Sequence, residues 1–186
     1  MDRKGTTRFL GDLLKADKLS GMCKYWASEV SIDYGHADKV KRVDFMQFQP
    51  PDQCSLSSLE KGIFTCYEIK SCVADAYSGN GLNFIGEKNY IVTTMECYKK
   101  LLPDIRTGKF KDHLHQNFPE SSDYYGFMVA IPRDREETDE YENPTPIPED
   151  GCINGWKLDI ILPCRQGPRY RSITELLFCM LRSGRY

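Results

Sequence analysis

The sequence predicts an α/β fold in which a mixed central β-sheet is flanked by helices. Runs of β-branched and aromatic residues alternate along the chain with stretches of helical spacing. Two of the runs, residues 89–94 and 125–131, are almost continuously hydrophobic, which is typical of strands buried on both faces. The chain has 186 residues, 40% of them hydrophobic, which is enough for one core and short for two. We therefore expect a single domain over residues 1–186.

The first half of the chain predicts a helix followed by three strands. Apolar residues recur at helical spacing over 6–21, and one of two adjacent threonines is the expected cap. A period of two over 26–32 predicts the first strand. Residues 41–49 and 63–69 are dense in aromatic and β-branched side chains and predict the second and third strands. We expect these two strands to pair antiparallel across a polar connection.

The second half predicts three further strands and two longer helices. A helical turn and a Gly-Asn-Gly loop follow Lys70 and lead into the buried strand 89–94. A helix is expected to begin at Met95 and to stop before Pro103, with a polar, loop-like stretch over 106–123 that holds at most one short helix. The remaining expected elements are strands at 125–131 and 156–162 and a closing helix at 173–181.

Charge is distributed unevenly along the chain. The net charge is −2, but residues 134–150 carry eight acidic side chains against one Arg, a local −7 that leaves +5 for the rest. We interpret this stretch as part of an acidic insertion at about 134–152. A basic surface interrupted by one acidic segment is compatible with a phosphate ligand. The alternative is that the acidic and basic side chains are simply solvated.

The chain carries no predicted membrane or secretion signal. Its longest apolar stretches fall far short of the ~20 residues that cross a bilayer, and the N-terminus lacks an uninterrupted apolar region. We therefore expect a cytoplasmic protein without membrane association. The eight cysteines show no CxxC pair and no zinc-ligand spacing, so reduced thiols are favoured over a disulfide framework.

One short motif carries a candidate chemistry. Alternate strand residues point to the same face, so Glu68 and Lys70 are expected to lie side by side while Ile69 packs into the core. If the strand at 41–49 pairs with this one, Asp44 supplies a second carboxylate to the same point. Two carboxylates with vacant positions suit Mg²⁺, with Mn²⁺ as a substitute. Beside two acids, Lys70 is expected to act electrostatically on a phosphodiester rather than as a neutral base.

These residues resemble the PD-(D/E)XK, or restriction-endonuclease-like, nuclease superfamily, and in particular its MmcB-like DNA-repair branch. That branch has a Glu in the first strand, an Asp in the second, Glu-x-Lys-Ser closing the third and an Asp in the next short helix. The matching residues here are Glu29, Asp44, Glu68, Lys70, Ser71 and Asp75. The resemblance spans roughly residues 6 to 131, and the late strands and the closing Arg-containing helix extend it to nearly the whole chain.

The resemblance implies a restriction-endonuclease-like core and metal-dependent hydrolysis of nucleic-acid phosphodiester bonds, as an endo- or exonuclease. DNA is the expected substrate and Mg²⁺ the expected cofactor. The resemblance also suggests a phage or mobile-element gene in a bacterial cytoplasm, and a homo-oligomer is left open. The predicted catalytic residues are Asp44, Glu68 and Lys70, of which Asp44 and Glu68 are the predicted metal ligands.

Other residues are weaker candidates for the same site. Glu29 could join the metal site or be ordinary solvent-facing charge, and Asp75 could orient its neighbours or lie on a helix face. Ser71 could bind phosphate or cap a helix. Arg169 and Arg171 flank an aromatic residue and suit nucleic-acid contacts, or they are a helix lead-in. Two alternatives to the nuclease stay open: a catalytically inactive nuclease-fold module that binds nucleic acid or a protein partner, and an accidental match in an unrelated α/β protein.

Overall fold

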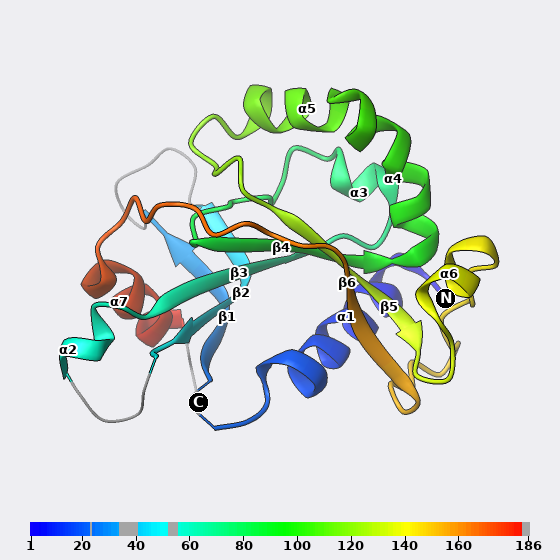
Figure 1. The fold of residues 1–186 in the computed structure, drawn as a ribbon, viewed down its shortest axis with the longest axis horizontal. Coiled ribbons are helices and arrows are strands. Elements are labelled where there is room, and N and C mark those ends of the chain that lie inside the picture. The colour runs from blue at the N-terminus through cyan, green and yellow to red at the C-terminus, as the bar shows by residue number, and fades with distance from the viewer. Residues whose placement is uncertain (23, 34–40, 52–55, 184–186) are drawn as a thin grey trace.

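A six-stranded mixed sheet forms the centre of the molecule (Figure 1). The computed structural model describes residues 1–22, 24–33, 41–51 and 56–183. Within these ranges the strands lie side by side in chain order. The first three are antiparallel neighbours, the third, fourth and fifth run parallel, and the sixth is antiparallel to the fifth. The strands are β1 (Tyr25–Ile32), β2 (Lys41–Gln49), β3 (Ile63–Ile69), β4 (Lys88–Thr94), β5 (Gly126–Pro132) and β6 (Trp156–Leu162). The predicted mixed α/β class is confirmed.

Helices cover both faces of this sheet (Figure 1). The first helix lies on one face and continues as a π-helical turn over Lys15–Leu19. Three helices after β3 and β4 cover the other face, and the last helix packs beside β1. The helices are α1 (Arg3–Leu14), α2 (Leu56–Leu59), α3 (Val73–Ala76), α4 (Met95–Thr107), α5 (Lys109–Asn117), α6 (Glu137–Glu142) and α7 (Ile173–Ser183).

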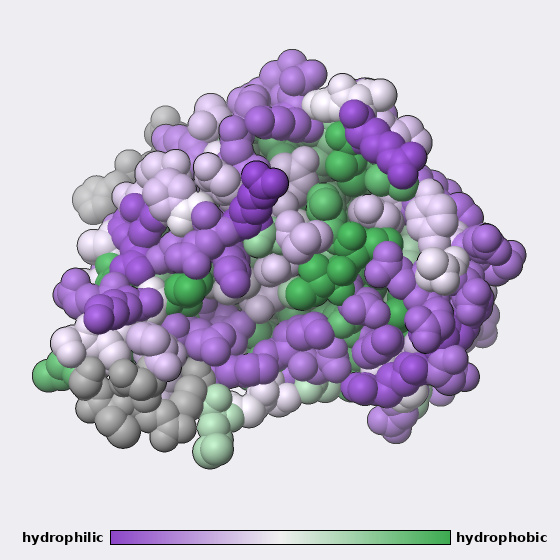
Figure 2. Space-filling model, viewed as in Figure 1, coloured by the Kyte–Doolittle hydropathy of each residue, from purple (hydrophilic) through white to green (hydrophobic). Residues whose placement is uncertain are grey.

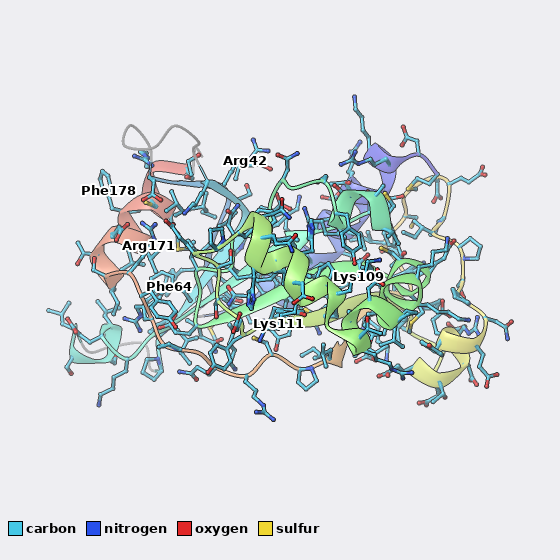
Figure 3. The ribbon with its side chains drawn as sticks, turned by 90° about the horizontal axis from the view of Figure 1, so that it is seen from above. Arg42, Phe64, Lys109, Lys111, Arg171 and Phe178 are labelled. Atoms are coloured by element: carbon cyan, nitrogen blue, oxygen red, sulfur yellow. The ribbon has the colours of Figure 1, made fainter. Side chains whose placement is uncertain are left out.

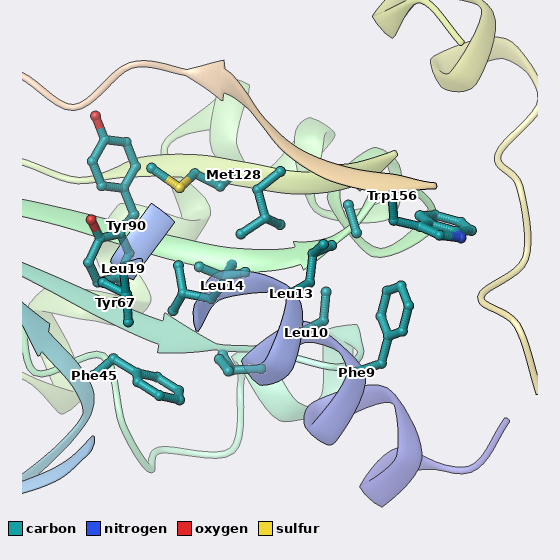
Figure 4. Close-up of a cluster of buried hydrophobic side chains, with 14 of the residues drawn as sticks. Phe9, Leu10, Leu13, Leu14, Leu19, Phe45, Tyr67, Tyr90, Met128 and Trp156 are labelled. Atoms are coloured by element: carbon teal, nitrogen blue, oxygen red, sulfur yellow. The ribbon is translucent and has the colours of Figure 1, made fainter. Parts of the chain in front are cut away.

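Helix α1 packs its apolar stripe on the sheet (Figure 4). Its buried leucines and Phe9 face side chains from β2 to β6, and the Phe9 ring meets the Trp156 ring edge-on at a centroid distance of 5.4 Å. Gly11 lies in the same stripe, where a Cβ would be 3.4 Å from Ile69. Burial of this stripe is worth roughly 1.5–3 kcal/mol for each large apolar side chain. The helix is therefore held by the sheet more than by its own propensity.

The opposite face of the sheet carries two cores side by side. Helices α4 and α5 bury apolar residues against β4 and β5, and α7 buries Leu176, Cys179 and Met180 against β1 to β3. Polar side chains occupy the region between the two cores. The β3–β4 register sets Glu68 beside Ile91, whose side chain belongs to the α4–α5 core. This face therefore holds the candidate site.

Some sequence-based expectations about the helices were wrong. Helix α1 begins at Arg3, because the Asp2 carboxylate and not a threonine accepts the first free N–H, from Gly5 at 2.7 Å. Helix α4 does not stop before Pro103 but runs on to Thr107. Contacts on both sides of the proline hold the helical path, since Leu101 is buried and the Tyr77 hydroxyl donates to Asp104 at 2.7 Å.

The acidic segment is more ordered than a solvated insertion. It contains α6, and the Glu140 side chain within it is fully buried. That carboxylate accepts hydrogen bonds from the backbone and hydroxyl of Thr145 and pairs with Arg135 at 3.1 Å. Buried charge of this kind persists only when it is paired and hydrogen-bonded. One of the eight acids is therefore structural.

The outer surface is largely hydrophilic on the face shown in Figure 2, and hydrophobic side chains gather near its centre, around β6. None of the helices in the described ranges combines the length and apolar character required to cross a membrane. The six cysteines within those ranges form no disulfide.

Candidate active site

A break in strand alternation aims Asp44 toward β3. Ala27 and Val30 lie in the same α7-side core although three positions separate them, and Glu29 between them has a left-handed φ of 54°. Such irregularities re-aim side chains and are common beside functional sites. On the facing strand, Asp44 leaves the regular ladder, and its Oδ2 accepts a hydrogen bond from the Ile69 N–H at 2.8 Å. The Asp44 carboxylate thus accepts the hydrogen bond that a backbone carbonyl of β2 would accept in a regular antiparallel ladder.

Glu68 lies at the centre of the site with no exposed surface. Its Oε1 accepts a hydrogen bond from the Asn83 N–H at 3.2 Å, whereas Oε2 is buried without a hydrogen-bond partner. Burial raises the pKa of Glu68 well above its ordinary value, and the negative charge of Asp44 raises it further against the opposing charge of Lys70. The site therefore holds a carboxyl group that takes up a proton readily.

Lys70 directly follows β3, faces the same side of the sheet as Glu68 and is almost fully buried. Its Nζ donates to the Asn80 carbonyl oxygen at 2.7 Å, and its own carbonyl oxygen accepts from the Thr93 hydroxyl at 2.5 Å. Gly81 covers both charged groups. A Cβ on this glycine would lie 2.9 Å from Lys70 Nζ and 3.0 Å from Glu68 Oε2, and its φ of +67° also favours glycine. The loop can approach Lys70 and Glu68 this closely because Gly81 has no side chain.

Asp44 shares the charge balance of this cluster. Burial raises its pKa, and the Ile69 N–H, Lys70 and Arg42 lower it. The charge of Asp44 disfavours the ionised form of Glu68, and the charge of Asp75 disfavours that of Asp44, whereas Lys70 favours the ionised form of both acids. The cluster therefore brings two acids of raised pKa together with one cation.

Asp75 connects the end of β3 to the first helix. Its Oδ2 accepts from the backbone N–H and the hydroxyl of Ser71, both at 3.1 Å, and its Oδ1 accepts from Arg3 at 2.5 Å. Ser71 therefore bonds to Asp75, and Cys72 is the residue in the N-cap position of α3. The link places Arg3, whose side chain is largely exposed, at the mouth of the site.

A cleft of about 1270 Å³ opens beside these residues. Asp44, Lys70 and Gly81 form part of its wall, and Glu68 lies behind that wall. Helix α7, the segment after α5 and the start of α1 complete the enclosure. Of the residues predicted from sequence, the lining includes Glu29, Asp44, Lys70, Asp75 and Arg171.

The two predicted nucleic-acid-binding arginines occupy different settings. Arg171 lines the cleft and forms two 2.8 Å hydrogen bonds with the Asp33 carboxylate. Arg169 lies outside the cleft lining and pairs with the buried Glu87 at 2.5 Å. Seen from above, Arg42 and Arg171 lie in the half of the molecule that contains α7 (Figure 3). Glu29 pairs with Arg42 at 2.6 Å, and both side chains are exposed.

The carboxylates of the site suit a small hard cation such as Mg²⁺ in their number and type. Within the described ranges no three His, Cys, Asp or Glu side chains converge as a metal-binding group. Mg²⁺ is nevertheless commonly held by one or two carboxylates, with waters and phosphate oxygens as its other ligands. The unpartnered Glu68 Oε2 beside a second acid is a buried oxygen without a compensating proton donor. Asp44 and Glu68 are two carboxylates of the kind that such a cation takes as ligands.

Several lining residues were not singled out from sequence. They are Arg3, Lys41, Arg42, Asn83 and the segment after α5. The Gly-Asn-Gly triplet was predicted to be a loop, and its glycines do have positive φ, but nothing local indicated that it closes over Glu68 and Lys70. The lining residues come from separate segments that only the fold brings together.

Comparisons with known proteins add no relative. No family model, no curated protein and no solved structure matches this chain.

Proposed function

We propose that this protein is a metal-dependent nuclease that hydrolyses nucleic-acid phosphodiester bonds at the cleft beside β3. The observation that carries the proposal is the buried, unpartnered Glu68 Oε2, on which the charges of Asp44 and Lys70 both act. A structural carboxylate in a core is normally fully hydrogen-bonded, because an unsatisfied one costs about 1–3 kcal/mol or more. Such a group is more typical of a site that binds a proton or a cation.

The residues fall into distinct roles under this proposal. Asp44 and Glu68 would hold the divalent cation, which, when bound, supplies the positive charge that polarises a phosphoryl oxygen and acidifies a water. The Lys70 Nζ lies beside the two acids, where it donates to the Asn80 carbonyl oxygen, and would stabilise the negative charge that develops on the phosphate. Asp75 positions the end of β3 through Ser71. Glu29 remains a further candidate for the site, because it lines the cleft together with its ion-pair partner Arg42.

The positions of these residues along the fold support the resemblance to restriction-endonuclease-like nucleases. Glu29 lies on β1, Asp44 on β2, Glu68 on β3 and Asp75 on α3, immediately before a buried parallel strand. Within the three-stranded antiparallel unit, the pairing of β2 with β3 brings Asp44 close to Glu68 and Lys70. DNA is the expected substrate, and Mg²⁺ or Mn²⁺ the expected cofactor.

The direct test is cleavage of plasmid and single-stranded DNA with Mg²⁺ or Mn²⁺ by the natural protein, Lys70→Ala and Asp44→Asn. We expect cleavage by the natural protein and a loss of at least about a hundredfold in each variant, as for removal of an electrostatic catalytic group. Exposed Lys100→Ala is the matched control, since Lys100 pairs with Glu96 on the surface of α4, and it should cleave normally. Circular dichroism would show that each variant is folded.

A natural protein that cleaves neither substrate would transfer the proposal to its alternative, the inactive nuclease-fold module that binds nucleic acid or a protein. The complete burial of Glu68 behind the cleft wall is the observation that favours this alternative. Cleavage that survives both substitutions would show that the activity belongs to another site or to a contaminant.

A further inference from the structure

The main cleft continues into a second one. The second cleft, of about 580 Å³, is lined by the end of α5, by residues that follow α5 and by Tyr170 in the segment before α7. Pro119, Glu120, Ser121 and Tyr170 line both clefts. The two clefts therefore adjoin along these four residues, and together, from Lys70 to Tyr124, they are called the trough below.

An exposed aromatic ring lies where the two clefts meet. The Tyr170 side chain is 72% exposed, although the backbone around it is held on both sides. Arg169 before it donates to the Gly62 carbonyl oxygen at 2.6 Å, and Arg171 after it binds Asp33. A fixed backbone with an uncovered ring offers a stacking surface at a low entropic cost.

A second aromatic ring lines the trough further on. Tyr124 is 40% exposed, and Gly167 approaches it so closely that a Cβ there would lie 2.7 Å from the ring. The segment before α7 therefore rests on Tyr124 and carries Tyr170 three residues later. Aromatic faces spaced along a groove are the usual means of holding unpaired bases.

Charge in the trough favours stacking over phosphate neutralisation. The main cleft is lined by five cationic and five acidic side chains. Four of the cations are paired with acids: Arg3 with Asp75, Lys41 with Glu120, Arg42 with Glu29, and Arg171 with Asp33 and Glu175. Duplex DNA is bound largely through neutralised phosphates, and this lining has little uncompensated positive charge for that purpose.

The burial of Glu68 and Lys70 also favours a single-stranded ligand over a duplex. Lys70 is 4% exposed and Glu68 is completely buried, so a phosphate must enter the cleft to approach them. Duplex DNA is stiff, with a persistence length of about 150 base pairs, whereas a single strand bends readily and exposes its bases for stacking. The ligand that fits a recessed, charge-balanced and aromatic-lined trough is therefore a single strand.

We propose that this trough binds single-stranded nucleic acid, with one base stacked on Tyr170, and leads the strand toward Asp44, Glu68 and Lys70. The inference rests on the proposed function only for what happens to the strand after it binds, namely its hydrolysis. Binding itself requires neither the metal nor turnover.

The test is fluorescence anisotropy of a labelled single-stranded DNA oligonucleotide and of its duplex, both with EDTA present. We expect the single strand to bind at least about tenfold more tightly than the duplex. Tyr170→Ala should weaken single-strand binding by roughly 5- to 150-fold, the equivalent of about 1–3 kcal/mol for a lost stacking contact. Tyr170→Trp should restore it. The salt dependence should be shallow, corresponding to about one or two phosphate contacts.

The matched control is Tyr25→Ala, because Tyr25 is 57% exposed on β1 and lines neither cleft. This variant should bind like the natural protein. Equal or tighter binding of the duplex, no binding of either probe, or full binding by Tyr170→Ala would each overturn the inference. Single-strand binding without any cleavage in Mg²⁺ or Mn²⁺ would leave it standing and overturn only the nuclease proposal. Metal-dependent plasmid cleavage without single-strand binding would do the reverse.

Discussion

At the scale of single residues, stability and chemistry oppose each other at Glu68. The raised pKa means that the folded protein holds a proton there which the unfolded chain releases above its ordinary pKa of 4.5. Folding therefore loses stability as the pH rises from that value toward the raised one. The burial of an unpartnered carboxylate oxygen is the physical cause.

Replacement of this acid by an amide should stabilise the protein. Glu68→Gln is expected to raise the free energy of unfolding near about pH 8 by roughly 1–3 kcal/mol, and the gain should shrink toward about pH 5. Tm measured by thermal denaturation should rise by about 2–4 °C for each kcal/mol. Exposed Glu96→Gln should change stability by less than about 0.5 kcal/mol. Destabilisation by Glu68→Gln at both pH values would show that the carboxylate is structural.

At the scale of elements, a buried ion pair fastens the segment between β6 and α7 to the sheet. The Arg169 Nε donates to Glu87 Oε1 at 2.5 Å, and the other carboxylate oxygen accepts from the Phe64 N–H at 2.9 Å. The Gly167 N–H also donates to the Glu87 carbonyl oxygen at 2.8 Å. One acid thus orders the part of the chain that carries Tyr170.

Loss of the arginine should therefore destabilise the fold. Arg169→Ala would leave the buried Glu87 side chain without its cationic partner, at an expected cost of about 3–5 kcal/mol in urea unfolding. Exposed Arg165→Ala, in the same segment, is the comparison and should stay within about 0.5 kcal/mol of the natural protein. If the two variants were equally stable, the ion pair would not be what holds this segment.

At the scale of the whole molecule, the proposed metal site couples binding to stability. A ligand that binds only the folded state stabilises it by about 2.7 kcal/mol at a hundred times its Kd. Protons compete for Asp44 and Glu68 because the pKa of each is raised. Cation binding should therefore weaken as the pH falls.

Mg²⁺ or Mn²⁺ should accordingly raise Tm by several degrees near about pH 8 and by much less near about pH 5. Differential scanning calorimetry of the natural protein and Asp44→Asn measures this directly, and the variant should show little response. A shift of the same size in both proteins, or at both pH values, would place the cation elsewhere.

The strands of this protein follow from its local sequence. The runs at 41–49, 63–69 and 156–162 become strands with those bounds, since alternation and β-branched side chains act over a few residues. The same period of two placed Glu68 and Lys70 on one face, with Ile69 in the opposite core. The order of the elements also predicted a mixed sheet, because helices are interspersed among the strands.

Tertiary contacts decided the rest. Helix α4 passes through Pro103 because packing around Leu101 and the Asp104 hydrogen bond outweigh a local cost of about 3 kcal/mol. The Gly-Asn-Gly loop covers Lys70, and Asp33 meets Arg171 from 138 positions away. Local sequence determines the conformation of each strand and which of its side chains share a face. The contacts named above join groups that only the folded chain brings together, so the periodicity of the sequence does not predict them.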